Sequence, residues 1–301
     1  MTTNEDATWS MGEQEPITVV GFGTMGRGIA RAFAAAGYRV IACDRDDVSV
    51  AAGLDRLHAD LDRAVGRGRM TSGEAGAILG RIDTSTSLSV VAGAARLVIE
   101  AVPEDLELKR AVFRELDAAA SPATILATNT SALSIASIAS VTSDPGRVLG
   151  LHFFNPVHRM ELVELVVGIG TTRATVDAAV AWCRAIGKAT VEVADRAGFA
   201  TSRINALIGN EAFQMLLEGV ASADDIDTAV RLALHHPMGP FELVDLVGLD
   251  TRLAVLRRLH EVLGERFRPS PLLVELVDAG RLGRKVGHGV FRYDEDGSRI
   301  P

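Results

Sequence analysis

The sequence predicts an α/β Rossmann-type doubly wound sheet followed by an all-α C-terminal domain. Three observations lead to this prediction. The chain has 301 residues, a length typical of about two domains. Short β-rich runs alternate with helical segments up to residue 197, as in a parallel sheet covered by helices. From residue 198 onward only helical patterns remain. We therefore expect domains at 15–197 and 198–301, preceded by a flexible tail at 1–14.

Composition limits the partners and the location. A net charge of −8 and an aromatic content of 5% argue against nucleic acid and against an anionic membrane surface as partners. No apolar run approaches the ~20 residues of a membrane span, and residues 1–14 are unlike a leader peptide. We expect a cytoplasmic protein. Cys43 and Cys183 are expected to be reduced core residues. His235 and His236 lack a third ligand at any metal-binding spacing, so no metal site is expected.

The first strand–helix–strand unit carries a dinucleotide-binding motif. A strand at 17–21 opens into GFGTMG (21–26), and a helix at 27–37 leads to a second strand at 38–44. The glycines allow a tight turn, the approach of a pyrophosphate and close helix packing, and the helix N-terminus offers N–H groups to phosphates. Asp44 is placed to bond an adenosine ribose, although Arg45 could accommodate a 2′-phosphate. The predicted cofactor contacts here are Gly21, Gly23, Thr24, Met25, Gly26 and Asp44.

Two helices are expected within 47–81, with a short basic stretch between them. Arg63, Arg67 and Arg69 lie close together in this otherwise acidic chain. Such a patch can bind an anion, but it is more commonly a solvated helical face.

Polar residues follow the next two strands, expected at 96–102 and 124–129 on either side of a helix at 106–120. Glu100, Glu104 and the run 129–131 (NTS) stand at the carboxyl ends of these strands. A doubly wound sheet binds ligands at that edge. Each residue could instead cap a helix, as expected near Ser134, or form a turn.

His152 ends an apolar strand within 147–157, and Asn155-Pro156 then turns the backbone. Glu164 lies inside the next apolar run, 161–167, where a carboxylate must be partnered. A histidine bonded to a carboxylate is held in one tautomer and suits a general base. The alternative is a core histidine beside an incidental glutamate. A helix at 172–186 and a strand at 189–194 follow, and then helices at 201–218, 223–234, 241–263 and 270–279.

With these motifs in view, the chain resembles the L-3-hydroxyacyl-CoA dehydrogenases, and among them the short-chain 3-hydroxybutyryl-CoA dehydrogenases. The resemblance spans about residues 17–293. It is carried by GFGTMGRG (21–28), NTS (129–131), LHFFNP (151–156), LVE (162–164), HPMGP (236–240) and LGRK (282–285).

The resemblance implies a role for each matching residue. His152 would be the catalytic base, Glu164 its orienting carboxylate, and Ser131 would contact cofactor and substrate. The residues expected to approach NAD are Asp44, Glu104, Lys109, Asn129 and Lys285. Those expected at the CoA substrate are Arg67, Arg69, Ser131 and Asn155. The family also implies a homodimer through the C-terminal helices, although these helices could equally form a monomer core.

The sequence departs from the family pattern at two positions. Ser202 stands where the family has an asparagine that bonds near the reacting carbonyl, and Ala132 replaces a frequent serine. Ser202 could take over the substrate contact or merely cap the helix that begins there.

The expected reaction is NAD-dependent interconversion of a 3-hydroxyacyl thioester and the 3-keto thioester. His152 would take the hydroxyl proton while C3 passes hydride to the nicotinamide, with Glu164 stabilising the imidazolium. Two alternatives remain: a dehydrogenase of a free hydroxy or sugar acid on the same fold, and a non-catalytic NAD-binding protein.

Overall fold

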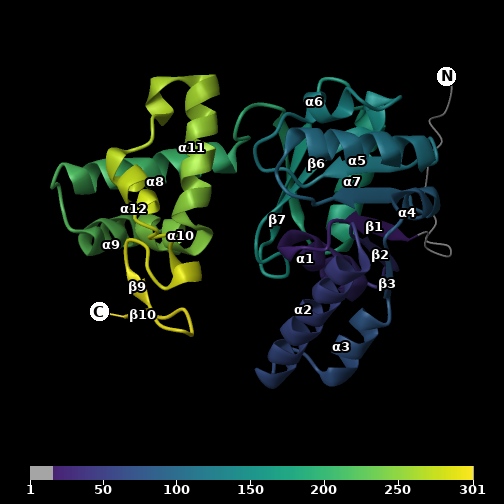
Figure 1. Cartoon of the computed structure of the whole chain (residues 1–301), viewed down its shortest axis with the longest axis horizontal. Helices are drawn as coiled ribbons and strands as arrows, with labels where there is room; N and C mark the ends of the chain where they lie inside the picture. Colours follow the sequence, from purple (N-terminus) through teal and green to yellow (C-terminus); the bar gives the residue numbers. More distant parts are fainter. Residues whose placement is uncertain (1–15, 301) are drawn as a thin grey trace, which may run out of the picture. The chain divides into compact units, whose positions relative to one another are not determined.

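The computed structural model describes residues 16–300, so the predicted tail at 1–14 lies outside the described range. The chain divides into two compact units after Asp195. The first contains a sheet flanked by helices, and the second is mainly helical (Figure 1). Within residues 16–300 no helix is long and apolar enough to cross a membrane.

The first unit is built on an eight-stranded sheet with the order β3-β2-β1-β4-β5-β6-β7-β8. Strands β1 to β6 run parallel, whereas β7 is antiparallel to β6 and β8 is parallel to β7. The order 3-2-1-4-5-6 is that of dinucleotide-binding sheets, in which ligands bind where the strand order reverses, here between β1 and β4. The strands are β1 (Ile17–Val20), β2 (Val40–Cys43), β3 (Ile82–Ser85), β4 (Leu97–Glu100), β5 (Ile125–Thr128), β6 (Val148–Phe153), β7 (Leu162–Val167) and β8 (Ala189–Ala194).

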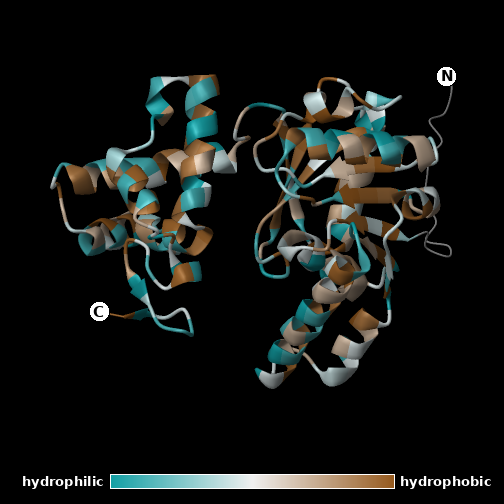
Figure 2. Ribbon diagram, in the orientation of Figure 1, coloured by the Kyte–Doolittle hydropathy of each residue, from teal (hydrophilic) through white to brown (hydrophobic). Residues whose placement is uncertain are grey.

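Helices cover both faces of this sheet. On one face, α1, α2, α3 and α7 share a core with alternate strand residues such as Val19, Ile99 and Leu151. On the other face α4, α5 and α6 pack against one another, and Ile135 of α6 meets Gly150 of β6. Hydrophobic residues accordingly fill the central strands (Figure 2). The helices are α1 (Thr24–Ala35), α2 (Asp47–Gly66), α3 (Ser72–Leu79), α4 (Leu88–Ala94), α5 (Leu106–Ala119), α6 (Ile135–Ala139) and α7 (Arg173–Ala185).

The sequence analysis made no assignment between residues 82 and 95, where β3 and α4 form. β3 reads IDTS, with two exposed residues, and so lacks the apolar pattern by which strands are recognised. Cys43 and Cys183 are buried and unpaired, which confirms the prediction of reduced core cysteines.

The second unit consists of helices around its own apolar core, which contains Phe213, Phe241 and Leu256. The single helix expected at 241–263 was wrong. Gly248, at φ +106°, interrupts it and separates two helices, because only glycine adopts such an angle readily. The helices are α8 (Thr201–Leu217), α9 (Ala223–Ala233), α10 (Pro240–Val247), α11 (Leu249–Leu263) and α12 (Pro271–Asp278).

The second unit is helical, as predicted, with one small addition. Arg292–Tyr293 (β9) and Arg299–Ile300 (β10) pair as a small antiparallel hairpin, with Gly297 at φ +75° in its turn. Strands of two residues are too short to produce a readable alternation of apolar and polar positions.

Candidate active site

The glycine-rich turn joins β1 to α1 and leaves one side of its backbone open. A Cβ at Gly21 would lie 2.7 Å from the Ala101 carbonyl carbon, and one at Gly26 would lie 1.8 Å from the Gly21 oxygen. Both glycines are therefore required by close backbone packing. A Cβ at Gly23 would meet no atom within 4 Å. The turn thus has open space on the side where a phosphate approaches the backbone in such motifs.

The N-terminus of α1 is available to an anion. Its N-cap is Gly23, which provides no side-chain hydrogen bond, and the first turn holds no acidic residue. The first N–H groups of a helix have no partner within the helix, and together with the helix dipole they favour a phosphate. These features fit the pyrophosphate of a dinucleotide, with Thr24 and Met25 in the first turn.

Asp44 follows β2 and is fixed by the backbone around the turn. One of its carboxylate oxygens accepts from the Phe22 N–H at 2.7 Å, and the other accepts from the Arg45 N–H at 2.8 Å. Each oxygen retains a lone pair for a ribose hydroxyl. The exposed Arg45 guanidinium pairs with Asp46 at 3.2 Å. The carboxylate of Asp44 is therefore oriented in advance for a free 2′-hydroxyl.

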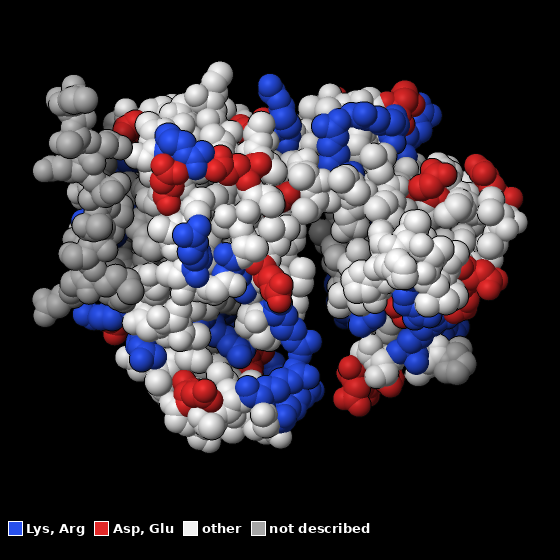
Figure 3. Space-filling model, turned by 180° about the vertical axis from the view of Figure 1, so that it is seen from behind, with Lys and Arg blue, Asp and Glu red and all other residues white. Residues whose placement is uncertain are grey.

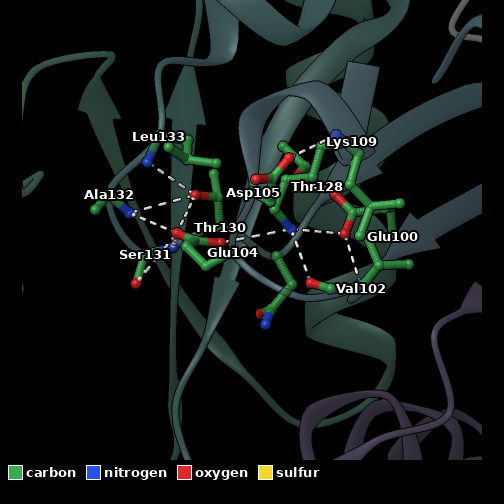
Figure 4. Close-up of polar contacts among 12 residues, drawn as sticks. Glu100, Val102, Glu104, Asp105, Lys109, Thr128, Thr130, Ser131, Ala132 and Leu133 are labelled. Atoms are coloured by element: carbon green, nitrogen blue, oxygen red, sulfur yellow. Dashed lines mark hydrogen bonds and ion pairs between the residues drawn. The ribbon is translucent and has the colours of Figure 1, made fainter. Parts of the chain in front are cut away.

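A buried ionic network supports the loop after β4 (Figure 4). Lys109 of α5 is 1% exposed, and its Nζ donates to Glu100 Oε1 at 2.6 Å and to the Val102 carbonyl at 3.2 Å. Thr128 of β5 donates to the other oxygen of Glu100 at 2.7 Å. Burial raises the pKa of Glu100, and the Lys109 ammonium and these hydrogen bonds act against that rise.

Glu104 connects this network to the loop after β5. Its Oε2 lies 3.5 Å from Lys109 Nζ. Its Oε1 accepts from Thr130 Oγ1 at 2.5 Å, from the Ser131 N–H at 3.0 Å and from the Ala132 N–H at 3.2 Å (Figure 4). Glu104 therefore sets the position of Ser131. The sequence analysis missed Thr128 as a supporting residue, and a threonine at the end of the otherwise apolar β5 strand was the available signal.

His152 and Glu164 form the ionisable pair that the sequence predicted. They stand directly opposite each other in the antiparallel β6–β7 register, and His152 Nδ1 lies 2.7 Å from Glu164 Oε2. His152 is 6% exposed and Glu164 is fully buried. The Phe154 ring lies 4.5 Å from the imidazole, centroid to centroid. With Nδ1 held by the carboxylate, the ring orientation and tautomer are fixed, which leaves Nε2 as the basic nitrogen.

Asn129 ties the Ser131 loop to the histidine strand. Its Oδ1 accepts from the Phe153 N–H at 2.9 Å, one residue beyond His152. Asn155 is exposed in the turn that ends β6, and its bond to Pro156 is cis. The first unit therefore brings Asn129, Ser131 and His152 to the carboxyl ends of the neighbouring strands β5 and β6, with Glu164 beside His152 on β7.

The remaining predicted residues belong to other elements. Arg67 and Arg69 are exposed just beyond the end of α2, and basic side chains gather over the lower part of this unit in Figure 3. Lys285 belongs to the second unit and pairs with Asp250 at 2.6 Å. Ser202 is the second residue of α8, whose N-cap is Ala200 with no side-chain bond. The alternative in which Ser202 caps this helix is therefore wrong.

No group of three or more His, Cys, Asp or Glu side chains within residues 16–300 could hold a metal ion. The parallel sheet, the open glycine-rich turn and the acid after β2 define a dinucleotide-dependent enzyme, and the buried His–Glu pair adds a base of the kind that dehydrogenases use.

Comparisons with known proteins identify the family. Residues 16–196 match the model of the 3-hydroxyacyl-CoA dehydrogenase NAD-binding domain, and residues 198–293 match that of the C-terminal domain of the same enzymes. The chain belongs to the 3-hydroxyacyl-CoA dehydrogenase family. It is an NAD-dependent oxidoreductase, which confirms the predicted fold class, enzyme class and cofactor.

The chain is similar over nearly its whole length to several known proteins. It is 43% identical to a probable 3-hydroxybutyryl-CoA dehydrogenase of Bacillus subtilis, over 94% of this chain and 99% of that one. A Mycobacterium tuberculosis 3-hydroxybutyryl-CoA dehydrogenase is 40% identical over 92% of this chain and 98% of its own length. The crystal structure of (S)-3-hydroxybutyryl-CoA dehydrogenase from Ralstonia eutropha superposes with a TM-score of 0.88 at 40% identity, over 94% of this chain and all of that one.

Proposed function

We propose that the protein interconverts a short-chain L-3-hydroxyacyl-CoA, such as 3-hydroxybutyryl-CoA, and the 3-ketoacyl-CoA. The observation that carries this proposal is the His152–Glu164 pair, in which a buried carboxylate 2.7 Å from Nδ1 holds the imidazole at a strand end. NAD supplies the hydride acceptor. Its phosphates and adenosine ribose would be held by the open turn at Gly23, the first turn of α1 and Asp44.

In the oxidation, His152 Nε2 takes the proton of the 3-hydroxyl as the C3–H bond breaks and a C=O double bond forms. Glu164 stabilises the imidazolium that results, so the positive charge develops beside a fixed carboxylate. Ser131, positioned through Glu104, is placed to donate to the oxygen at C3. In the reduction, the imidazolium returns the proton to that oxygen.

A direct assay tests this function. Acetoacetyl-CoA should support NADH oxidation, whereas free acetoacetate should not, and NADH should be used better than NADPH because Asp44 repels a 2′-phosphate. The choice of substrate needs this test because a diketoreductase and a pyridine-carboxylate dehydrogenase, named for substrates without CoA, are each 30% identical to this chain. Faster turnover of the free acid would contradict the proposal.

We also propose a cytoplasmic homodimer. The buried unpaired cysteines suit a reducing compartment. The α8–α9 surface bears an apolar groove lined by Leu207, Ile208, Met215 and Val230, which a second copy would cover. Sedimentation of the purified protein as a monomer at micromolar concentration would contradict the dimer, and recovery of the protein outside the cytoplasmic fraction would contradict the location.

Arg67 and Arg69 are expected to attract the phosphates of CoA. Changing both to glutamine should raise KM for acetoacetyl-CoA about 2–30-fold, because exposed charge contacts contribute ~0.2–1 kcal/mol each, and should flatten its salt dependence. Acetoacetyl-pantetheine, which lacks these phosphates, provides the control and should show no change. An unaltered KM for the CoA ester would make the two arginines a solvated surface.

Ser202 is expected to bond the substrate in place of the family asparagine, directly or through a water. Ser202→Ala should lower kcat/KM about 2–10-fold, which corresponds to the ~0.5–1.5 kcal/mol of one hydrogen bond, while the melting temperature stays constant. Ser202→Asn should select against branched 3-ketoacyl-CoAs because its longer side chain fills the space. If the alanine variant melts earlier at unchanged kcat/KM, the serine has a structural role only.

A further inference from the structure

An arginine occupies the inward face of α11 in the second unit. The buried residues of this helix include Leu249, Leu253, Leu256 and Leu259, and Arg252 lies among them with only 4% exposure. Its spacing of three residues from Leu249 and four from Leu256 places it on the stripe where a helix buries apolar side chains. Arginine is almost never fully buried unless it is paired.

The Arg252 guanidinium makes no hydrogen bond or ion pair with any residue in the described range 16–300, and its Nε is wholly buried without a partner. Burial lowers its pKa to about 10, so the group remains a cation at neutral pH. The buried carboxylates of this unit are occupied elsewhere. Asp227 accepts from the N–H groups of residues 241 and 242, and Asp245 from those of residues 290 and 291. An uncompensated buried cation destabilises the unit strongly.

The neighbouring helix α8 approaches this guanidinium closely and has no side chain at the point of approach. Gly209 lies in the middle of α8, where a glycine costs about 1 kcal/mol relative to alanine. A Cβ at this position would lie 3.1 Å from Val244 Cγ2 and 3.8 Å from Arg252 Nε. The adjacent Asn210 accepts from the Ser270 N–H, and the Oγ of Ser270 is also buried without a partner within residues 16–300. Two buried polar atoms without a partner in the described range, Arg252 Nε and Ser270 Oγ, thus lie near the Gly209-Asn210 step of α8.

We propose that Arg252 is the centre of a carboxylate-binding site in the helical unit. A guanidinium presents a planar fork of N–H donors that matches a carboxylate in geometry and supplies the charge that the fold lacks here. The carboxylate has two possible sources: a free small carboxylate, or the end of an acyl group carried on CoA. The second source rests on the proposed function.

The free carboxylate is tested by melting the full-length protein in increasing sodium acetate at constant ionic strength. The melting temperature of wild type should rise by several degrees and then level off as the acetate site fills. Arg252→Met should lose this response. Arg252→Met should also melt higher than wild type in plain buffer, since an apolar side chain replaces an unpaired buried charge. Arg257→Met, at an exposed position of the same helix, should respond as wild type does. Gly209→Ala narrows the site and should weaken the acetate response in a chain that keeps Arg252.

The acyl source is tested with two 3-ketoacyl-CoAs of equal length, one ending in a carboxylate and one in a methyl group. Their kcat/KM ratio should fall at least 10-fold in Arg252→Met and stay constant in Arg257→Met. An acetate response with an unchanged ratio assigns the site to free carboxylates. The absence of both effects would overturn the proposal. If neither wild type nor the two variants reduce acetoacetyl-CoA, the proposed function is contradicted. The acetate result would still stand.

Discussion

Replacing His152 by alanine is expected to lower kcat by about 10²–10⁴-fold, the range that a positioned general base contributes. Glu164 holds the side chain at 2.7 Å from the neighbouring strand β7, and the predicted phosphate and ribose contacts lie on the β1–α1 turn and after β2. The dissociation constant of NADH should therefore change by no more than about twofold. Stopped-flow reduction of acetoacetyl-CoA gives kcat, and NADH fluorescence gives the binding constant.

The control for this variant is His58→Ala. His58 is exposed on α2, and its loss should leave both constants unchanged. Turnover within threefold of wild type in His152→Ala would show that another group carries the proton, and the pair would then be a structural feature of the β6–β7 ladder. Loss of NADH binding together with turnover would instead indicate that the alanine variant is misfolded.

The His152–Glu164 contact could be predicted because each residue alone violates the apolar pattern of its strand. A carboxylate and an imidazole in adjacent buried runs must find partners, and the turn at Asn155-Pro156 returns the chain so that they can meet. The antiparallel register that sets them opposite each other could not be predicted from the sequence. The other site residues came from the resemblance, and their contacts with cofactor and substrate stay predictions.

The features that the sequence analysis missed depend on tertiary contacts. The break at Gly248 falls inside a continuous helical pattern, since a glycine within a helix is tolerated at a modest cost. Gly248 has a φ of +106°, and a Cβ at this position would also lie within 3.5 Å of atoms of the Lys285–Asp250 pair. Arg252 likewise stands in a helical stripe that is otherwise apolar, and only the structure shows that no side chain within residues 16–300 neutralises it.

The buried position of Lys109 differs from the role that the family resemblance implied for it. The lysine was expected to approach NAD, yet its side chain is 1% exposed and its ammonium lies between Glu100 at 2.6 Å and Glu104 at 3.5 Å. We infer that Lys109 acts on the cofactor site through Glu104, which accepts from the Thr130 hydroxyl and from the N–H groups of residues 131 and 132. Direct contact with NAD stays an untested prediction.

Lys109→Met is therefore expected to lower the free energy of unfolding of the first unit by about 3–5 kcal/mol, because it leaves the buried Glu100 carboxylate without its cation. The remaining donors to Glu100, from Thr128 and the Val102 N–H, cannot neutralise the charge. Urea unfolding followed by tryptophan fluorescence reports on this unit, since Trp182 lies on α7 and the sequence has no tryptophan after it.

The double variant Glu100→Gln/Lys109→Met separates the loss of charge pairing from the loss of packing. Glutamine keeps an acceptor for Thr128 and the Val102 N–H but carries no charge, so the double variant should recover at least half of the stability lost by Lys109→Met. In both variants NADH should bind more weakly, because Glu104 loses the neighbour that orients it toward Thr130 and Ser131. Equal stability of Lys109→Met and wild type would show that the buried pair contributes nothing net. A double variant no more stable than Lys109→Met would assign the loss to packing of the lysine stem rather than to the unpaired buried charge of Glu100.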